Sequence, residues 1–166
     1  MHSTRYTIIF IVVLTSIAAL LLSSMSTGLK SVHDRNEALF NKRAILSAVE
    51  NQLDKEVPSL SDEEVEQIFT TQIEQLELNM SGAEVEGQML LDRGYKGQKA
   101  EHIDMAKEKK RDEADRILPL FIFEKGGDKT YIVSVRGNGL WDEIWGNIAI
   151  GDDFNTVTGA SFDHKG

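Results

Sequence analysis

The chain opens with a long uncharged and largely apolar run, and only later takes on a mixed polar pattern. Residues 6–29 include no charged side chain. A helix needs about 20 residues, at about 1.5 Å each, to cross the hydrocarbon core of a bilayer. We therefore expect a transmembrane anchor over residues 6–27, preceded by a stub of residues 1–5. A cleaved signal peptide is the alternative, with Arg5 as its charged start and residues 8–22 as its apolar segment.

The orientation of this anchor does not follow from charge counting. Arg5 precedes the apolar run, and Lys30 and Arg35 follow it, so positive residues flank both sides. A short amino-terminal stub is easily retained inside the cell, and long acidic domains are translocated largely regardless of their charge. We expect the stub to be cytoplasmic and the bulk of the chain to be extracytoplasmic, on the periplasmic side of an inner membrane.

Beyond the anchor, the apolar positions indicate two helices and a short strand. The first helix is predicted to end at Val57-Pro58. Ser61 followed by Glu64 forms a capping box, which predicts a second helix that reaches Leu76. Residues 84–91 alternate between apolar and polar, which is typical of a strand. The first helix is predicted from apolar residues that recur at near-helical spacing: Val32, Leu39, Ile45, Leu46, Val49 and Leu53.

A dense run of charge covers residues 101–116. Opposite charges three and four residues apart support a helix that is solvated on its own. We favour that interpretation over a docking site for an acidic partner.

The last third of the chain is rich in β-strand signals. Residues 117–124 and 129–135 are predicted strands, and Gly126-Gly127-Asp128 between them indicates a hairpin. Residues 148–150 and 156–162 are expected to continue an antiparallel sheet. The fold class is therefore predicted as α+β: a single transmembrane helix, a helical or mixed extracytoplasmic region over residues 28–116, and a mostly antiparallel sheet over residues 117–166.

Composition narrows the functional classes. The chain has 166 residues, a formal net charge of −9 and no cysteine. An acidic surface without a basic groove argues against a nucleic-acid partner. The lack of cysteine excludes disulfides and thiolate metal sites. The histidines His2, His33 and His102 show no metal-ligand spacing, so we assign no metal.

The stretch Arg136-Gly-Asn-Gly-Leu-Trp141 is the most distinctive motif. Gly137 and Gly139 lie beside Leu140 and Trp141, and glycine tolerates tight turns and lets a backbone approach a flat group closely. An indole can stack on a planar ring, although a core position at a sheet corner is the alternative for Trp141. Arg136 pairs either with a phosphate or with a surface carboxylate.

This motif, with Trp145-Gly146 and the run from Asp153 to His164, resembles the C subunit of the sodium-translocating NADH:quinone oxidoreductase. It is similar, less closely, to the G subunit of the Rnf electron-transport complex. The amino-terminal apolar segment and residues 44–48 agree with the anchor and first helix of the sodium-pump subunit. Residues 58–118 have only loose similarity.

The resemblance implies a flavoprotein with an FMN-binding domain, whose first part corresponds to residues 117–166. The implied non-covalent surroundings of FMN are Gly137, Gly139, Leu140, Trp141 and His164. In the family, FMN is attached through a phosphoester to a threonine in a Ser-Gly-Ala-Thr motif. We expect that motif beyond residue 166, and so expect the domain to be incomplete at its carboxyl end.

Two short sequences resemble the attachment motif. The stretch that starts at Ser81 lacks a hydroxyl at the acceptor position, which is Glu84. The stretch that starts at Thr158 offers Ser161, but it lies in a predicted strand. We expect no attachment residue in this chain.

The function implied by the resemblance is electron transfer by FMN in a membrane complex. That complex couples NADH oxidation by a quinone, such as ubiquinone, to sodium export. The expected partners are the other subunits and membrane lipid, and we nominate no catalytic residue in this chain. The alternatives are a membrane-anchored assembly or binding subunit without a cofactor, and an Rnf-type electron-transport subunit. A hydrolase is least favoured, because no nucleophile elbow or Ser/His/Asp grouping occurs.

Overall fold

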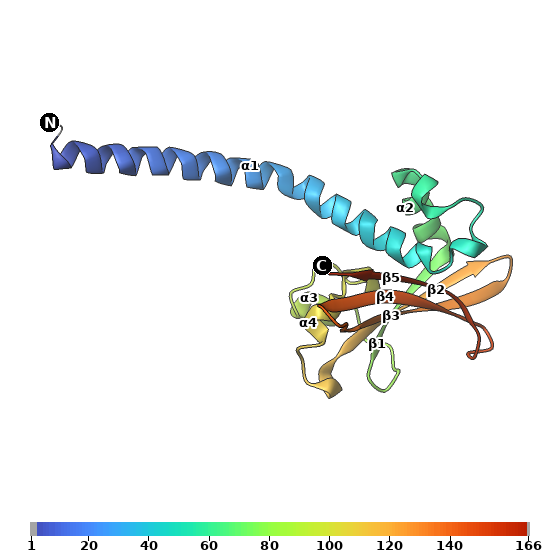
Figure 1. Cartoon of the computed structure of the whole chain (residues 1–166). Helices are drawn as coiled ribbons and strands as arrows, with labels where there is room; N and C mark the ends of the chain where they lie inside the picture. Colours follow the sequence, from blue (N-terminus) through green and yellow to red (C-terminus); the bar gives the residue numbers. More distant parts are fainter. Residues whose placement is uncertain (1–2, 166) are drawn as a thin grey trace. The chain divides into compact units, whose positions relative to one another are not determined.

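The computed structural model describes residues 3–165, and the chain divides into two compact units between Ala38 and Leu39. Figure 1 shows helices and one antiparallel sheet. The helices are α1 (Thr4–Ser47), η1 (Glu50–Gln52), η2 (Val57–Ser59), α2 (Asp62–Gln72), α3 (Gln88–Asp92), η3 (Ala100–His102), α4 (Met105–Glu108) and η4 (Glu113–Asp115). The strands are β1 (Ile73–Asn79), β2 (Ile117–Lys125), β3 (Asp128–Asn138), β4 (Glu143–Gly151) and β5 (Val157–His164).

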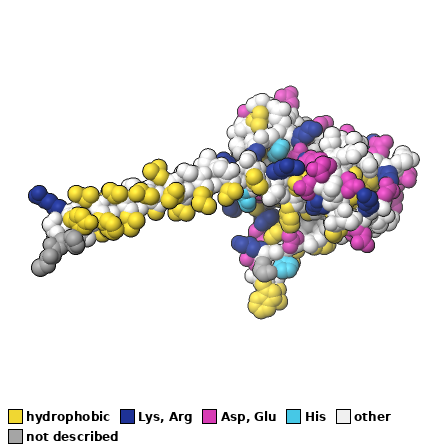
Figure 2. Space-filling model, turned by 90° about the horizontal axis from the view of Figure 1, so that it is seen from above, with side chains coloured by type: hydrophobic (Ala, Val, Ile, Leu, Met, Phe, Trp, Pro, Cys, Tyr) yellow, Lys and Arg dark blue, Asp and Glu magenta, His cyan; other side chains and the backbone are white. Residues whose placement is uncertain are grey.

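Helix α1 contains both the apolar run and the amphipathic segment that follows it. An 18-residue window in this helix has a mean hydropathy of 2.6, and none of that window is buried. Figure 2 shows hydrophobic side chains following one another along it. Among residues 3–165, α1 alone is long and apolar enough to cross a membrane. The prediction of a separate amphipathic helix that ends at Val57-Pro58 was wrong, because one helix continues to Ser47.

Helix α2 begins at the predicted capping box. The Ser61 hydroxyl accepts a hydrogen bond from the Glu64 N–H, and the Glu64 carboxylate accepts one from the Ser61 N–H. The two bonds satisfy donors that the first turn of a helix leaves free. The helix ends at Gln72 rather than at Leu76, since Leu76 pairs with Leu120 in the sheet. The predicted end of this helix was therefore wrong.

The sheet is a five-stranded antiparallel meander in which the strand order β1-β2-β3-β4-β5 follows the chain. The predicted hairpin joins β2 to β3, with Gly126 at φ 67° and Gly127 at φ 95°. Glycine occupies this left-handed region without the steric cost of a Cβ. With the long apolar helix α1, this sheet confirms the predicted α+β fold class.

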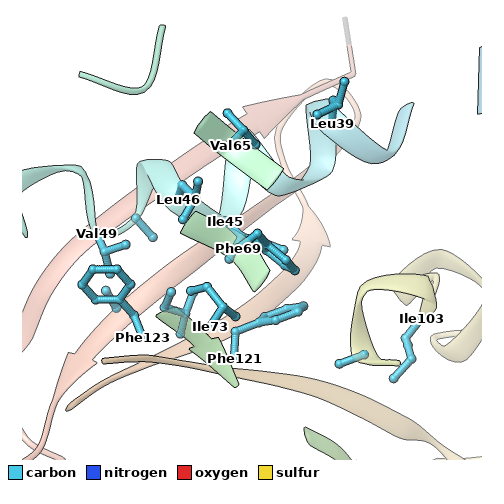
Figure 3. Close-up of a cluster of buried hydrophobic side chains, with 14 of the residues drawn as sticks. Leu39, Ile45, Leu46, Val49, Val65, Phe69, Ile73, Ile103, Phe121 and Phe123 are labelled. Atoms are coloured by element: carbon cyan, nitrogen blue, oxygen red, sulfur yellow. The ribbon is translucent and has the colours of Figure 1, made fainter. Parts of the chain in front are cut away.

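One face of the sheet is covered by the end of α1 and by α2. Leu46, Val49, Val65 and Phe69 from these segments are almost fully buried, as are Phe121 and other residues of the sheet. Figure 3 shows these side chains meeting in a single cluster. Their burial provides the main driving force for folding of the second unit.

The opposite face, called the outer face below, is also apolar. Its residues alternate along the strands with those of the covered face. Most are only partly buried or are exposed. The apolar ones are Leu76, Leu78, Leu118, Leu120, Ile122, Tyr131, Val133, Val135, Ile144, Ile148, Ile150, Ala160 and Phe162. Glu74, Glu124, Lys129 and His164 lie on the same face towards the ends of the strands.

The segment between β1 and β2 differs most from expectation. Residues 84–91 contribute one isolated bridge, Leu78 to Glu84, and the start of α3 rather than a strand. Residues 101–116 form short helices, of which α4 has four residues, instead of one solvated helix. Glu108 in this segment is fully buried. Both predictions for the segment were wrong.

Candidate functional site

The Arg-Gly-Asn-Gly-Leu-Trp motif forms the end of β3 and the turn into β4. The Gly139 N–H donates to the Asp142 carbonyl across this turn, at 2.8 Å. Neither Gly137 nor Gly139 lies in the left-handed region, so positive φ does not explain these glycines. A Cβ on Gly139 would lie 2.6 Å from Cδ1 of Ile144, whereas a Cβ on Gly137 would meet open space. Position 139 is therefore crowded, mainly by the movable end of the Ile144 side chain, whereas position 137 is open.

The tip of this turn presents two apolar side chains to solvent. Leu140 is 90% exposed and Trp141 is 93% exposed. The alternative of a core tryptophan at a sheet corner is therefore wrong. An indole with both faces open can stack on a planar aromatic ligand.

The predicted residues from β3 and β5 lie at the same end of the sheet as this tip. Gly137 pairs with Ile144, and Ile144 pairs with His164 on the other side. The Lys165 N–H donates to the Glu143 carbonyl, which continues this pairing past His164. The sheet thus brings together Gly137, the Leu140–Trp141 tip and His164, although they come from separate parts of the sequence.

Arg136 is engaged within the protein. Its guanidinium forms an ion pair with Glu143 and lies over the Trp145 ring, 5.0 Å from the ring centroid. The Arg136 hydrogen bond holds the pKa of Glu143 below its usual range. Lys109 also contacts Glu143, at 3.4 Å. Of the two interpretations of Arg136, the structure shows the carboxylate pair.

The two sequences that resemble an attachment motif have structural roles. The Ser161 hydroxyl donates to the Ala44 carbonyl of α1 at 2.7 Å. Ser81 and Gly82 form a turn after β1, in which the Asn79 side chain accepts from the Ser81 N–H and hydroxyl. Gly82 has a φ of 80°.

The site suits the ring of a flavin better than its phosphate. An exposed indole beside an exposed leucine offers a stacking surface for a planar ring. The cation nearest to the tip along the motif, Arg136, already has a carboxylate partner. Among residues 3–165, no group of three or more His, Cys, Asp or Glu side chains is arranged to hold a metal ion. His2 lies outside the described residues.

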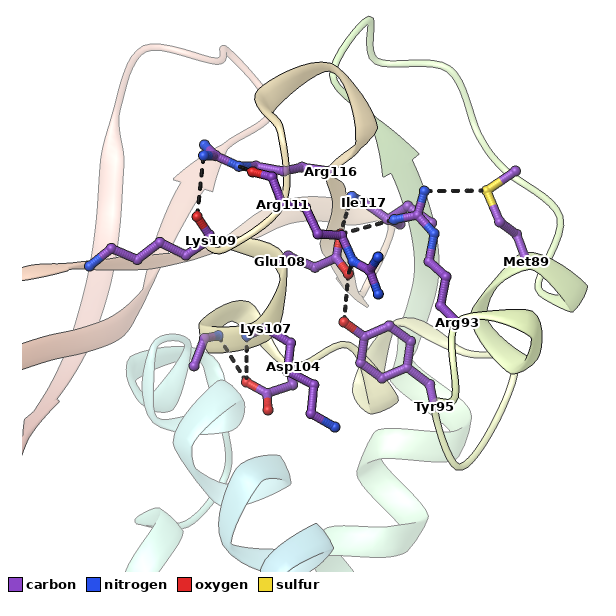
Figure 4. Close-up of polar contacts among 11 residues, drawn as sticks. Met89, Arg93, Tyr95, Asp104, Lys107, Glu108, Lys109, Arg111, Arg116 and Ile117 are labelled. Carbon is purple, nitrogen blue, oxygen red and sulfur yellow. Dashed lines mark hydrogen bonds and ion pairs between the residues drawn. The ribbon is translucent and has the colours of Figure 1, made fainter.

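Sequence reasoning missed a second constellation, centred on Glu108 (Figure 4). Its carboxylate accepts from the Tyr95 hydroxyl at 2.6 Å, the Ile117 N–H at 2.8 Å, Arg111 at 2.9 Å and Arg93 at 3.1 Å. Burial alone would raise the pKa of Glu108, but the hydrogen bonds from Tyr95, Ile117 and Arg111 hold it below its usual range. Burial and the adjacent carboxylate raise the pKa of Tyr95.

The Glu108 cluster is a structural anchor. Four donors surround one carboxylate, and they tie α4 to the start of β2 and to the loop after α3. The spacing of charged residues within the run 101–116 does not predict this cluster, because Arg93 and Tyr95 lie outside that run. Arg93 and Tyr95 shortly before that run, and Arg111 within it, are the only hint that the sequence contains.

A helix apolar enough to cross a membrane, joined to an α+β domain on an antiparallel meander, defines a candidate membrane-anchored α+β protein. Its sequence is similar to the C subunit of Na(+)-translocating NADH-quinone reductase from Pseudomonas aeruginosa, with 28% identity over 178 residues. The match covers 99% of this chain and 65% of the relative. No family model matches the chain.

The fold agrees with the same subunit from another organism. The crystal structure of the C subunit of Na(+)-translocating NADH-quinone reductase from Parabacteroides distasonis superimposes with a TM-score of 0.64 and 28% sequence identity. The match covers 83% of this chain and 59% of that structure. The resemblance to this subunit that the sequence predicted is thereby confirmed. The chain spans less than two thirds of the length of both relatives.

Proposed function

We propose that this chain is an electron-transfer subunit of a membrane complex that couples NADH oxidation by a quinone to sodium export. Similarity to the C subunit of the sodium-translocating reductase, in both sequence and fold, supports this assignment. The observation that carries the cofactor proposal is the exposed Leu140–Trp141 tip at the same end of the sheet as His164. FMN, when bound, supplies the ability to accept and donate electrons, and the protein supplies position and electrostatic environment.

The residues proposed to surround FMN divide into two roles. Trp141 and Leu140 would contact the isoalloxazine ring through their apolar surfaces. Gly137, Gly139 and His164 would form the adjoining backbone wall at the end of β3 and β5. No residue of this chain is assigned as a covalent attachment point, since the Ser161 hydroxyl is engaged by Ala44.

The proposed topology is based on helix α1, which is long and apolar enough to cross a membrane, and on the resemblance of the chain to the C subunit. Residues 6–27 would span the inner membrane, and residues 1–5 would remain in the cytoplasm. Residues 28–116 and the sheet region 117–166 would lie on the periplasmic side. Other subunits of the reductase and membrane lipid are the proposed partners. The net charge of −9 disfavours nucleic acid.

Fluorescence of the two tryptophans tests the cofactor proposal, because the chain contains only Trp141 and Trp145. Trp145→Phe leaves Trp141 as the sole emitter, and Trp141→Phe leaves Trp145. The full chain in detergent is titrated with FMN. We expect strong, saturable quenching in the Trp145→Phe variant and weak quenching in the Trp141→Phe variant. Equal quenching of both, or none, would overturn the assignment of Trp141.

Membership of the complex needs a separate experiment. The tagged full chain is expressed in a cell that contains the other reductase subunits and lacks the corresponding subunit of its own. We expect co-purification of those subunits and sodium-stimulated NADH oxidation. Co-purification without bound flavin would support the cofactor-free assembly subunit, which the engaged Ser161 hydroxyl favours as the alternative. Co-purification with Rnf components instead would move the assignment to that complex.

A further inference from the structure

The sequence of β2 is unusual for a sheet with one face in water. Residues 117–123 read Ile-Leu-Pro-Leu-Phe-Ile-Phe, without a polar residue. An antiparallel strand with a solvated face alternates between apolar and polar residues, and a continuous apolar run is typical of a strand buried on both faces. The covered face accounts for Ile117, Phe121 and Phe123. Leu118, Leu120 and Ile122 lie on the outer face.

The outer face is apolar across the whole width of the sheet. The strand register aligns one cross-strand row through all five strands: Leu76, Leu120, Val133, Ile148 and Ala160. Five strands at about 4.8 Å spacing make this row about 19 Å wide. The row has no charged or polar member.

The two faces differ sharply in burial. Phe121, Ile132 and Ala149 on the covered face are at most 2% exposed. None of the five residues of the row reaches the same degree of burial. Phe162, next to the row on β5, is 62% exposed. Leu76, Leu120, Val133 and Ile148 are partly exposed and Ala160 is exposed. A contiguous apolar patch that is left partly open to solvent is typical of an interaction surface.

The comparisons indicate what kind of molecule fits this surface. Both relatives contain polypeptide beyond the part that matches this chain, since the match covers 65% of one and 59% of the other. A sheet that is apolar on both faces requires a second packed layer. We propose that the outer face is the docking surface for a further polypeptide segment, of the kind that the longer relatives contain outside their matched part. This proposal does not depend on a flavin.

Cysteine labelling offers a direct test, because the chain contains no cysteine. Val133→Cys and Ile148→Cys place single thiols on the row, and Thr70→Cys places one at an exposed position of α2, which covers the opposite face, as a control. Each full-length variant is purified in nanodiscs. It is labelled with a maleimide, alone and after co-expression with the part of the Pseudomonas aeruginosa relative that lies outside the match.

Protection should be confined to the outer face. We expect the labelling rates of the Val133→Cys and Ile148→Cys variants to fall by on the order of tenfold, as when about nine in ten copies are covered. The rate of the Thr70→Cys variant should not change. Unchanged rates at both row positions would overturn the proposal. Protection without the segment would also overturn it: concentration dependence would indicate a second copy, and protection in nanodiscs but not in detergent would indicate lipid.

A charge placed on the row gives an independent readout. Val133→Glu with Ile148→Glu should abolish co-purification of the segment. Leu91→Glu, at an exposed apolar position on α3, should retain it. The circular dichroism of each variant shows whether it is folded. Equal retention by folded charge variants would contradict the proposal.

Discussion

Replacement of Glu108 by glutamine tests whether the buried carboxylate anchors the segment between β1 and β2. Glutamine has nearly the same shape as glutamate, so packing is preserved. However, it replaces one acceptor oxygen by an NH2 group that faces donors. The Tyr95 hydroxyl, the Ile117 N–H and the two arginines compete for the single remaining oxygen.

The size of the stability loss depends on which of the four donors to Glu108 can reach water in the variant. Arg93 and Arg111 have side chains that are 19% and 37% exposed, so water can replace part of what they lose. The hydrogen bonds of the Tyr95 hydroxyl and the Ile117 N–H to Glu108 are buried, and a buried unsatisfied donor costs about 1–3 kcal/mol. We therefore expect Glu108→Gln to lower the free energy of unfolding by about 3 kcal/mol. This corresponds to a Tm lower by roughly 10 °C.

The assay is thermal unfolding of the full chain in detergent, followed by tryptophan fluorescence and circular dichroism. Glu113→Gln serves as the control, because Glu113 lies in the same charged segment but is exposed. Tyr95→Phe, which removes only one donor, should cost about 1 kcal/mol. If Glu108→Gln and Glu113→Gln shift Tm equally, the carboxylate does not anchor the segment and the reasoning fails.

Acid provides a second check on the same group. The pKa of Glu108 is depressed in the folded protein, so the unfolded state binds more protons as the pH falls below the ordinary value of 4.5. The stabilisation by Glu108 is therefore complete above pH 4.5 and is lost as the pH falls through the folded pKa. The difference in Tm between the wild type and the Glu108→Gln variant should shrink over this acid range. A difference that stays constant would contradict the depressed pKa.

Three further predictions concern other single substitutions. Gly159→Ala places a Cβ against the Ala48 carbonyl oxygen, so it should destabilise the protein by about 1–3 kcal/mol. Gly137→Ala is the control, because a Cβ at that position meets open space and should not destabilise the protein. Comparison of the Tm values of the two variants checks this. Ser61→Ala removes the cap of α2 and should cost about 1 kcal/mol, measured by chemical denaturation. Trp141→Ala should leave stability within about 0.5 kcal/mol of the wild type while it abolishes the FMN response; a large loss of stability would show that the indole is packed.

The parts of the fold that the sequence predicted correctly depend on local chemistry. The hairpin between β2 and β3 follows from Gly126-Gly127, which supplies the left-handed turn whatever surrounds it. The start of α2 follows from the reciprocal bonds of Ser61 and Glu64. These signals lie within a few residues of the elements that they define.

The errors arose where distant residues decide the structure. Leu76 continues a helical pattern, but pairing with Leu120 places it in a strand, so tertiary contact overrides local preference. Glu108 belongs to a charge pattern typical of a solvated helix, yet donors from Tyr95 and Ile117 make its burial possible. For the candidate site, the sequence indicated the Leu140–Trp141 tip, but it could not show that the tip is exposed or that Gly137 and His164 share one end of the sheet.

The meander order of the strands has a consequence for biogenesis. Each strand pairs with the one made just before it, so the sheet grows by one strand at a time as the chain emerges. No strand has to wait for a pairing partner that is made later in the chain. The Ser161 bond to Ala44 then joins residues that are 117 positions apart, and it forms only after β5 has been made. Closure of β5 onto the end of α1 thus follows the synthesis of all five of these strands.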